Sequence, residues 1–279
     1  MNAALHPPRP ALLIVLLAAC GGAEPSRSSA GAADGTLTIS IAGSRMEGPT
    51  SVPAGWTRLR HATPADARAH SYAAFLLPDG VAASDFVAAF DTARTTPAGA
   101  TALGGPDGEA PEVVLQLAEG RVVVTCILRH SDGRRHATGG EWHEVRVLPR
   151  AAGQRGPDEP ASGIVVDMGD FAFTTAEKWP AGAQVIGVRN SGKEDHLLLL
   201  SRLHEGARLA DAMKPGAPDM TGPAVGISRL GSGGRAYLPV TLAPGRYVLT
   251  CLIPDASRGR PHAALGMVKE VEVVATGSS

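Results

Sequence analysis

The 279-residue chain lacks the features that would place it in several broad classes. Its formal net charge is -1 with both signs interspersed, so it has no basic stripe of the kind that binds nucleic acid or an anionic membrane surface. After residue 20 no segment reaches the roughly 18 apolar residues that span a bilayer. The apolar stretch at 196–203 is far too short for that and is predicted to be a buried strand. No nucleic-acid partner is expected.

Several catalytic motifs are also missing. The sequence contains neither Gly-x-Ser-x-Gly nor His-Glu-x-x-His. The glycine-rich segment at 229–235, RLGSGGR, lacks both the strand-to-helix setting and the Lys-Ser/Thr pair of a phosphate-binding loop. We interpret this segment as a hairpin loop.

The first of only three cysteines, Cys20, ends an N-terminal stretch that is typical of a secretory signal. The stretch RPALLIVLLAAC has one positive charge, a short apolar run and small residues before the cysteine. This ending resembles a bacterial lipobox, which implies a signal peptide at 1–20 and lipidation of Cys20. The alternative is an ordinary signal peptide cleaved elsewhere, because small residues also precede ordinary cleavage sites.

Residues 21–35 are rich in Gly, Ser, Ala and Pro and cannot bury enough apolar surface to order themselves, so they are predicted to be a flexible tether. The rest of the chain is therefore expected outside the cytoplasmic membrane, lipid-anchored at the cell envelope on the periplasmic or cell-surface side. Disulfides are permitted in that compartment.

The remaining chain contains an internal repeat. The segments LAEGRVVVTCIL at 117–128 and LAPGRYVLTCLI at 242–253 are identical at seven of twelve positions, and an offset of 125 to 126 residues persists on both sides. We predict one domain at 36–148 (repeat 1) and another at 163–275 (repeat 2), joined by a linker at 149–162.

Each repeat reads as short strands joined by turns, in keeping with the 34 glycines and 22 prolines. Opening strands are predicted at 36–43 and 163–173, and closing strands at 143–148 and 268–274. A short helical insertion is expected where apolar residues recur at i, i+4, as in Phe86 and Phe90 or Leu209 and Met213. The predicted fold class is all-β: two tandem Greek-key β-sandwiches.

Four residues of repeat 2 form a candidate metal site. Cys251 ends a strand, His262 follows after ten residues, Met267 begins the last strand, and His196 precedes a strand that reaches the same end. Two imidazoles and a thiolate in a plane, with a weak axial thioether, suit both copper oxidation states and so support electron transfer.

The segment PHAALGMVKEV at 261–271 is similar to the Pro-His-x-x-x-Gly-Met-Val-x-x-Val ending of plastocyanin-type domains. Repeat 2 thus resembles a cupredoxin, which implies one copper ion bound by His196, Cys251, His262 and Met267 for electron transfer or copper handling. The resemblance also implies that the chain interacts with a redox partner or with another protein of the cell envelope. Two features depart from the family pattern. Leu197 stands where the family has Asn, and the interval between Cys251 and His262 is longer than in plastocyanin.

The alternative interpretation is metal-free. A free cysteine behaves as a small buried hydrophobe, so Cys251 could simply end a core strand. The chain would then be a β-sandwich lipoprotein that binds or scaffolds other envelope components.

Repeat 1 carries a related set, His70, Cys126, His136 and Glu141, in which a carboxylate replaces the thioether. A hard oxygen donor favours oxidised copper or zinc over cuprous copper, so this is either a different metal site or a weaker, degenerate copy. A disulfide between Cys126 and Cys251 is disfavoured, because the two residues hold equivalent positions in separate domains and a bridge needs Cα atoms within about 7 Å.

The residues beside the cysteines argue against an enzyme. In copper nitrite reductases and multicopper oxidases, which a two-domain cupredoxin resembles, histidines next to the copper cysteine carry electrons to a second copper centre. Here Thr250 and Leu252 flank Cys251, and Thr125 and Ile127 flank Cys126. No relay to a second centre is expected.

Overall fold

The computed structural model describes residues 35–62, 70–212 and 221–275. The predicted signal peptide, Cys20 and nearly all of the tether lie outside the described residues. Among the helices in the described part of the chain, none is long and apolar enough to cross a membrane.

Repeat 1 forms a sandwich of two β-layers. One layer has the strand order β2-β1-β4-β8 and the other β3-β10-β9-β5-β6, with β7 alongside the second layer. Its strands are β1 (Thr36–Ala42), β2 (Arg45–Glu47), β3 (Ser51–Pro53), β4 (Gly55–His61), β5 (Tyr72–Leu76), β6 (Thr101–Gly104), β7 (Pro106–Gly108), β8 (Glu112–Leu117), β9 (Gly120–Cys126) and β10 (Trp142–Leu148).

Repeat 2 copies this arrangement, with layers β12-β11-β14-β17 and β13-β19-β18-β15-β16. Its strands are β11 (Ile164–Gly169), β12 (Ala172–Thr174), β13 (Lys178–Pro180), β14 (Gly182–Asn190), β15 (His196–Leu203), β16 (Thr221–Leu230), β17 (Arg235–Leu242), β18 (Gly245–Thr250) and β19 (Val268–Val274). The predicted all-β fold of two tandem sandwiches is confirmed.

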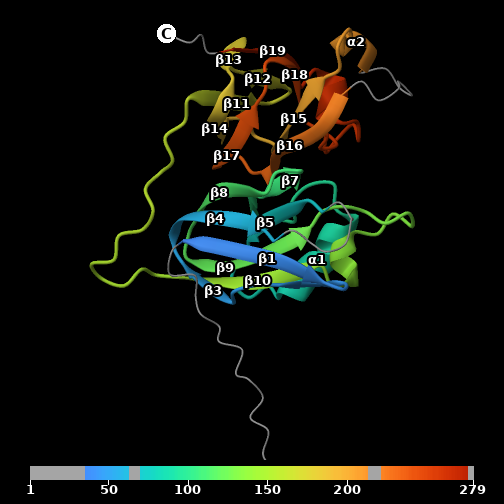
Figure 1. Ribbon diagram of the computed structural model, residues 1–279. Coiled ribbons are helices and arrows are strands. Elements are labelled where there is room, and N and C mark those ends of the chain that lie inside the picture. The colour runs from blue at the N-terminus through green and yellow to red at the C-terminus, as the bar shows by residue number, and fades with distance from the viewer. Residues whose placement is uncertain (1–34, 63–69, 213–220, 276–279) are drawn as a thin grey trace, which may run out of the picture.

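The two sandwiches join edge to edge, so that both layers continue from one repeat into the other (Figure 1). β17 pairs with β8, its counterpart in repeat 1, and β16 pairs with β6 and β7. One cluster of buried apolar residues draws on both repeats, including Leu115 and Leu230. Edge strands that would otherwise expose unpaired backbone groups are thus covered by each other.

The helical insertion of repeat 1 is α1 (Ala83–Thr92), in which Phe86 and Phe90 stack with ring centroids 5.8 Å apart. They share one buried face with Phe75, as the i, i+4 spacing predicts. The insertion of repeat 2 contains α2 (Leu209–Ala212), while Met213 lies outside the described residues.

The opening strand of repeat 2 differs from its prediction. We expected a single strand over 163–173, but the chain turns at Asp170 and Phe171, and β11 pairs back on β12. Phe171 has φ +63°, a left-handed conformation that ends the strand. Asp favours such turns because its side chain bonds to nearby backbone groups. The opening strand of repeat 1 and both closing strands lie where they were predicted.

Candidate metal centre

Three of the predicted residues of repeat 2 meet at one end of its sandwich. His196 begins β15, Cys251 follows β18, and His262 begins the 3₁₀ turn η2 (His262–Leu265). One donor atom from each lies within 4.8 Å of the other two. His196 Nδ1 is 3.0 Å from His262 Nδ1, which is 3.5 Å from Cys251 Sγ. All three side chains are fully buried.

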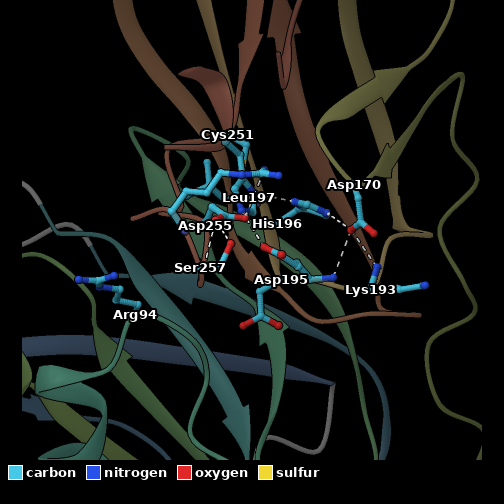
Figure 2. A network of polar contacts seen from close by, with 12 residues as sticks. Arg94, Asp170, Lys193, Asp195, His196, Leu197, Cys251, Asp255 and Ser257 are labelled. Carbon is cyan, nitrogen blue, oxygen red and sulfur yellow. Dashed lines mark hydrogen bonds and ion pairs between the residues drawn. The ribbon is translucent and has the colours of Figure 1, made fainter. Parts of the chain in front are cut away.

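The outer nitrogens of both imidazoles face carboxylates. His196 Nε2 donates to Asp170 at 3.2 Å, as Figure 2 shows, and His262 Nε2 donates to Glu194 at 3.0 Å. Because an ionised carboxylate only accepts hydrogen bonds, each Nε2 carries the proton and each Nδ1 of a neutral ring is left as a lone pair. Burial lowers the pKa of His196 and outweighs the hydrogen bond to Asp170, which raises it. The lowered pKa favours the neutral ring.

This tautomer assignment places two Nδ1 lone pairs 3.0 Å apart with a sulfur beside them. Lone pairs at that distance repel unless a cation, either a metal ion or a shared proton, lies between them. Neutral imidazole nitrogens with carboxylates on their far side are also the usual arrangement of histidine metal ligands. The residues present therefore fit a bound metal ion.

The sulfur is deeply desolvated. Burial raises the pKa of the Cys251 thiol to about 11, although backbone N–H groups of Leu197 and Ile253 lower it. The Leu197 N–H lies 3.4 Å from Sγ. The backbone at 197 thus supports the sulfur directly, whatever side chain stands there. The thiol carries its proton at neutral pH, so a metal ion must displace it on binding.

The ten-residue interval between Cys251 and His262 is a braced loop. Pro254 and Pro261 pair as an isolated β-bridge, and the His262 N–H donates to the carbonyl of Ile253. The buried Asp255 carboxylate accepts the hydroxyl of Ser257 at 2.8 Å together with nearby backbone N–H groups, which Figure 2 shows in part. These contacts hold the loop in place without a metal.

Met267 adjoins the same group. It is fully buried in the main core, its N–H donates to the carbonyl of His262 at 2.9 Å, and its own carbonyl accepts from Cys251 N–H at 3.3 Å. Its backbone is therefore tied to two of the three clustered residues.

A second loop, 191–195, carries Glu194 and leads into His196. The side chain of Asn190 is buried and donates to the carbonyls of Glu194 and Leu230, both at 2.8 Å. Asp195, which lies between Glu194 and His196, accepts from the hydroxyl of Thr96 at 2.6 Å and from Arg229 at 2.8 Å. Because Thr96 belongs to repeat 1, the first repeat helps to position this loop.

Repeat 1 brings all four of its predicted residues together. Donor atoms of His70, Cys126, His136 and Glu141 all lie within 4.8 Å of one another. Cys126 Sγ is 3.9 Å from His70 Nδ1 and 3.6 Å from His136 Nδ1. Glu141 Oε2 is 3.3 Å from His70 Nδ1 and 3.2 Å from His136 Nδ1.

The two cysteines have matching surroundings. Burial raises the pKa of the Cys126 thiol to about 12, while N–H groups of Leu128 and Ser71 lower it. These two residues correspond to Ile253 and Leu197 beside Cys251. Both Cys126 and Cys251 are free thiols. The two repeats therefore surround their sulfur atoms in the same way, and the position that holds Glu141 in repeat 1 holds Met267 in repeat 2.

Sequence reasoning missed the carboxylates behind the imidazoles. Asp170 fell within the strand predicted at 163–173, so no role was assigned to its side chain. Glu194 lies in the segment NSGKEDH, which has no pattern that marks it as a partner of a histidine. A signal did exist for Asp170, since a Gly-Asp pair inside a strand pattern favours a turn.

No protein-family model and no curated protein matches the chain. Among solved structures, it is similar to reduced auracyanin from Roseiflexus castenholzii, with 20% identity and a TM-score of 0.28, over 39% of this chain and 94% of that one. It is also similar to auracyanin A, a blue copper protein from Chloroflexus aurantiacus, with 17% identity and a TM-score of 0.26, over 40% and 97%. Rusticyanin from Thiobacillus ferrooxidans gives 17% and 0.27, over 40% and 75%.

Proposed function

We propose that this chain is a cupredoxin-like, lipid-anchored protein outside the cytoplasmic membrane that binds one copper ion in repeat 2, for electron transfer or copper handling. The observation that carries the proposal is the convergence of His196 Nδ1, His262 Nδ1 and Cys251 Sγ, with all three residues fully buried. Both outer nitrogens are turned away toward carboxylates, so the inner ones face each other with no proton of their own.

Bound copper would supply one-electron chemistry at a site whose two nitrogens and one sulfur suit both oxidation states. The chain's own residues keep that site dry and rigid. Asp170 and Glu194 fix the ring orientations, and Leu197 N–H steadies the sulfur. Small structural change between oxidation states is what rapid electron transfer requires, and the braced loops favour it.

The experiment uses the chain without its predicted signal peptide and with Cys126→Ser, so that only repeat 2 retains its thiol. Cupric ion is added while the visible spectrum and the copper bound per chain are measured. We expect one copper per chain and a strong thiolate-to-copper absorption band. The matched variant adds Cys251→Ser and should lose the band. A chain that stays colourless and binds no copper would overturn the proposal and favour a metal-free binding role.

Anchoring is tested separately on the full-length chain expressed in a bacterium that processes lipoproteins. Lipidation predicts a mature chain that begins at Cys20, carries the mass of its acyl groups and partitions into detergent. A Cys20→Ala chain should be released from the membrane fraction. An unmodified mature chain that begins at another residue would contradict the anchor.

A further inference from the structure

We propose that repeat 1 holds a divalent cation through His70, Cys126, His136 and Glu141, in a closed four-donor site that disfavours cuprous ion. The proposal concerns a different repeat and a different selectivity from the copper site above, so either can fail alone. It rests on the geometry of the four donors, on their charge and on their burial.

Four of the six separations between the donors are close to the edges of a tetrahedron around one ion. Bonds of about 2.0 Å to nitrogen or oxygen and about 2.3 Å to sulfur give edges of about 3.3 Å and 3.5 Å. The two distances from Glu141 Oε2 to imidazole nitrogens are 3.2 and 3.3 Å. The two distances from Cys126 Sγ to the same nitrogens are 3.6 and 3.9 Å. The other two pairs of donor atoms also lie within 4.8 Å, so one cation can reach all four atoms once the side chains close around it.

The charges of the donors match a doubly charged ion. A thiolate and a carboxylate carry two negative charges, so they neutralise a divalent cation and leave a monovalent one with a net charge of -1. In repeat 2 the thiolate has no charged counterpart to Glu141, because Met267 is uncharged. The thiolate alone therefore neutralises a monovalent ion. Because Cys126 is fully buried and Glu141 is 3% exposed, uncompensated charge here is costly. Charge balance thus separates the preferences of the two repeats.

The fold builds Glu141 into this position. The 3₁₀ turn η1 (His136–Gly139) ends at Gly140, whose φ of +114° reverses the chain. The Glu141 carbonyl then accepts from the N–H of Cys126 at 2.9 Å. A carboxylate kept inside a protein is paired or coordinates a metal. Without an ion, Glu141 accepts from the Nδ1 atoms of both imidazoles, and a bound cation would displace those two protons and the proton of the thiol. A hard oxygen donor also favours divalent ions over cuprous copper.

The test uses the Cys251→Ser chain, in which repeat 1 retains the only thiol of the two clusters. Cobalt(II) serves as a coloured probe and zinc(II) and copper(II) as competitors, with copper(I) titrated separately under reducing, oxygen-free conditions. We expect one Co²⁺ per chain, with the intense visible bands of tetrahedral coordination and a thiolate charge-transfer band. Either divalent competitor should displace it, and the one that does so at lower concentration identifies the preferred ion. Adding Cys126→Ser should abolish the charge-transfer band.

Two substitutions test the role of Glu141. Glu141→Gln keeps the side-chain size and should weaken divalent binding at least tenfold, roughly the low end of what loss of metal-site support costs. Glu141→Met copies repeat 2 and should move the preference toward copper(I). The control is Glu144→Gln, because Glu144 pairs with Arg121 on the surface of β10 and should leave binding unchanged.

The proposal is overturned if the Cys251→Ser chain, folded by circular dichroism, binds no divalent ion at micromolar concentration. That outcome would make the cluster a hydrogen-bonded network of imidazoles, thiol and carboxylate. It is equally overturned if Glu141→Gln and Glu144→Gln bind divalent ions alike, or if copper(I) is preferred with Glu141 in place. None of these results bears on copper binding by repeat 2.

Discussion

Replacement of Asp170 by Asn should weaken copper binding at repeat 2 with little effect on the fold. Asp170 Oδ1 accepts from His196 Nε2 at 3.2 Å and from the backbone N–H groups of Lys193 at 2.9 Å and Glu194 at 3.2 Å (Figure 2). Asn keeps an oxygen acceptor of the same size but loses the charge. The loop should therefore stay in place while the imidazole loses its ionic partner.

The magnitude follows from the hydrogen bonds. A bond to a charged group contributes about 1.5 to 3 kcal/mol and a neutral one about 0.5 to 1.5. The middles of these two ranges differ by about 1.3 kcal/mol. Because the Asp170 side chain is only 33% exposed, most of that difference should be retained, which is somewhat less than tenfold in the dissociation constant. Loss of such carboxylate support typically costs about 10- to 100-fold in metal affinity. We therefore expect the copper dissociation constant to rise roughly tenfold.

The assay is a competition titration against a chelator of known copper affinity, in the Cys126→Ser background. The matched control is Asp167→Asn on β11, the strand that precedes Asp170, because Asp167 bonds to Arg189 and Ser191 and not to an imidazole. Its dissociation constant should change less than about twofold, the size of a few tenths of a kcal/mol. Equal effects of the two substitutions, or none from Asp170→Asn, would refute the assigned role of Asp170.

Three further predictions concern the join between the repeats and the core. Gly108→Ala should lower the free energy of unfolding by at least about 2 kcal/mol, because φ is +61° and a Cβ would lie 2.1 Å from the carbonyl of Ala224. Gly133→Ala, at φ +86° with open space around it, should cost less in the same denaturant titration. Asp195→Asn should loosen the loop before the first histidine of repeat 2 and raise the copper dissociation constant by a few-fold in the chelator assay, and an unchanged constant would count against that bracing. Phe90→Ala should cost about 3 to 5 kcal/mol by urea unfolding, because this fully buried ring packs between two others.

The sequence was informative where the signal is local. The repeat, the strand that ends at each cysteine and the histidine after it depend on residues close together in the chain, and the structure places them as a cluster. The i, i+4 pair Phe86 and Phe90 was equally readable, since its period is that of a helix.

Other features depend on contacts that no local pattern encodes. Asp170 reaches His196 because a two-residue turn folds β12 back, and the turn depends on one left-handed residue, Phe171. The edge-to-edge pairing of β8 with β17 joins residues far apart in the chain, and main-chain bonds carry little sequence signal. The close approach of two backbones is visible only in the structure. At Gly108 and Gly226, for example, the neighbouring backbone leaves no room for a Cβ.

X-ray absorption at the copper edge of the loaded Cys126→Ser chain tests the central claim most directly, because it reports the atoms bound to the ion. The proposed site predicts one sulfur and two imidazole nitrogens at short distance, with the sulfur signal lost when Cys251→Ser is added. Copper surrounded only by nitrogen and oxygen donors, with a spectrum that Cys251→Ser leaves unchanged, would contradict a copper site built from His196, Cys251 and His262.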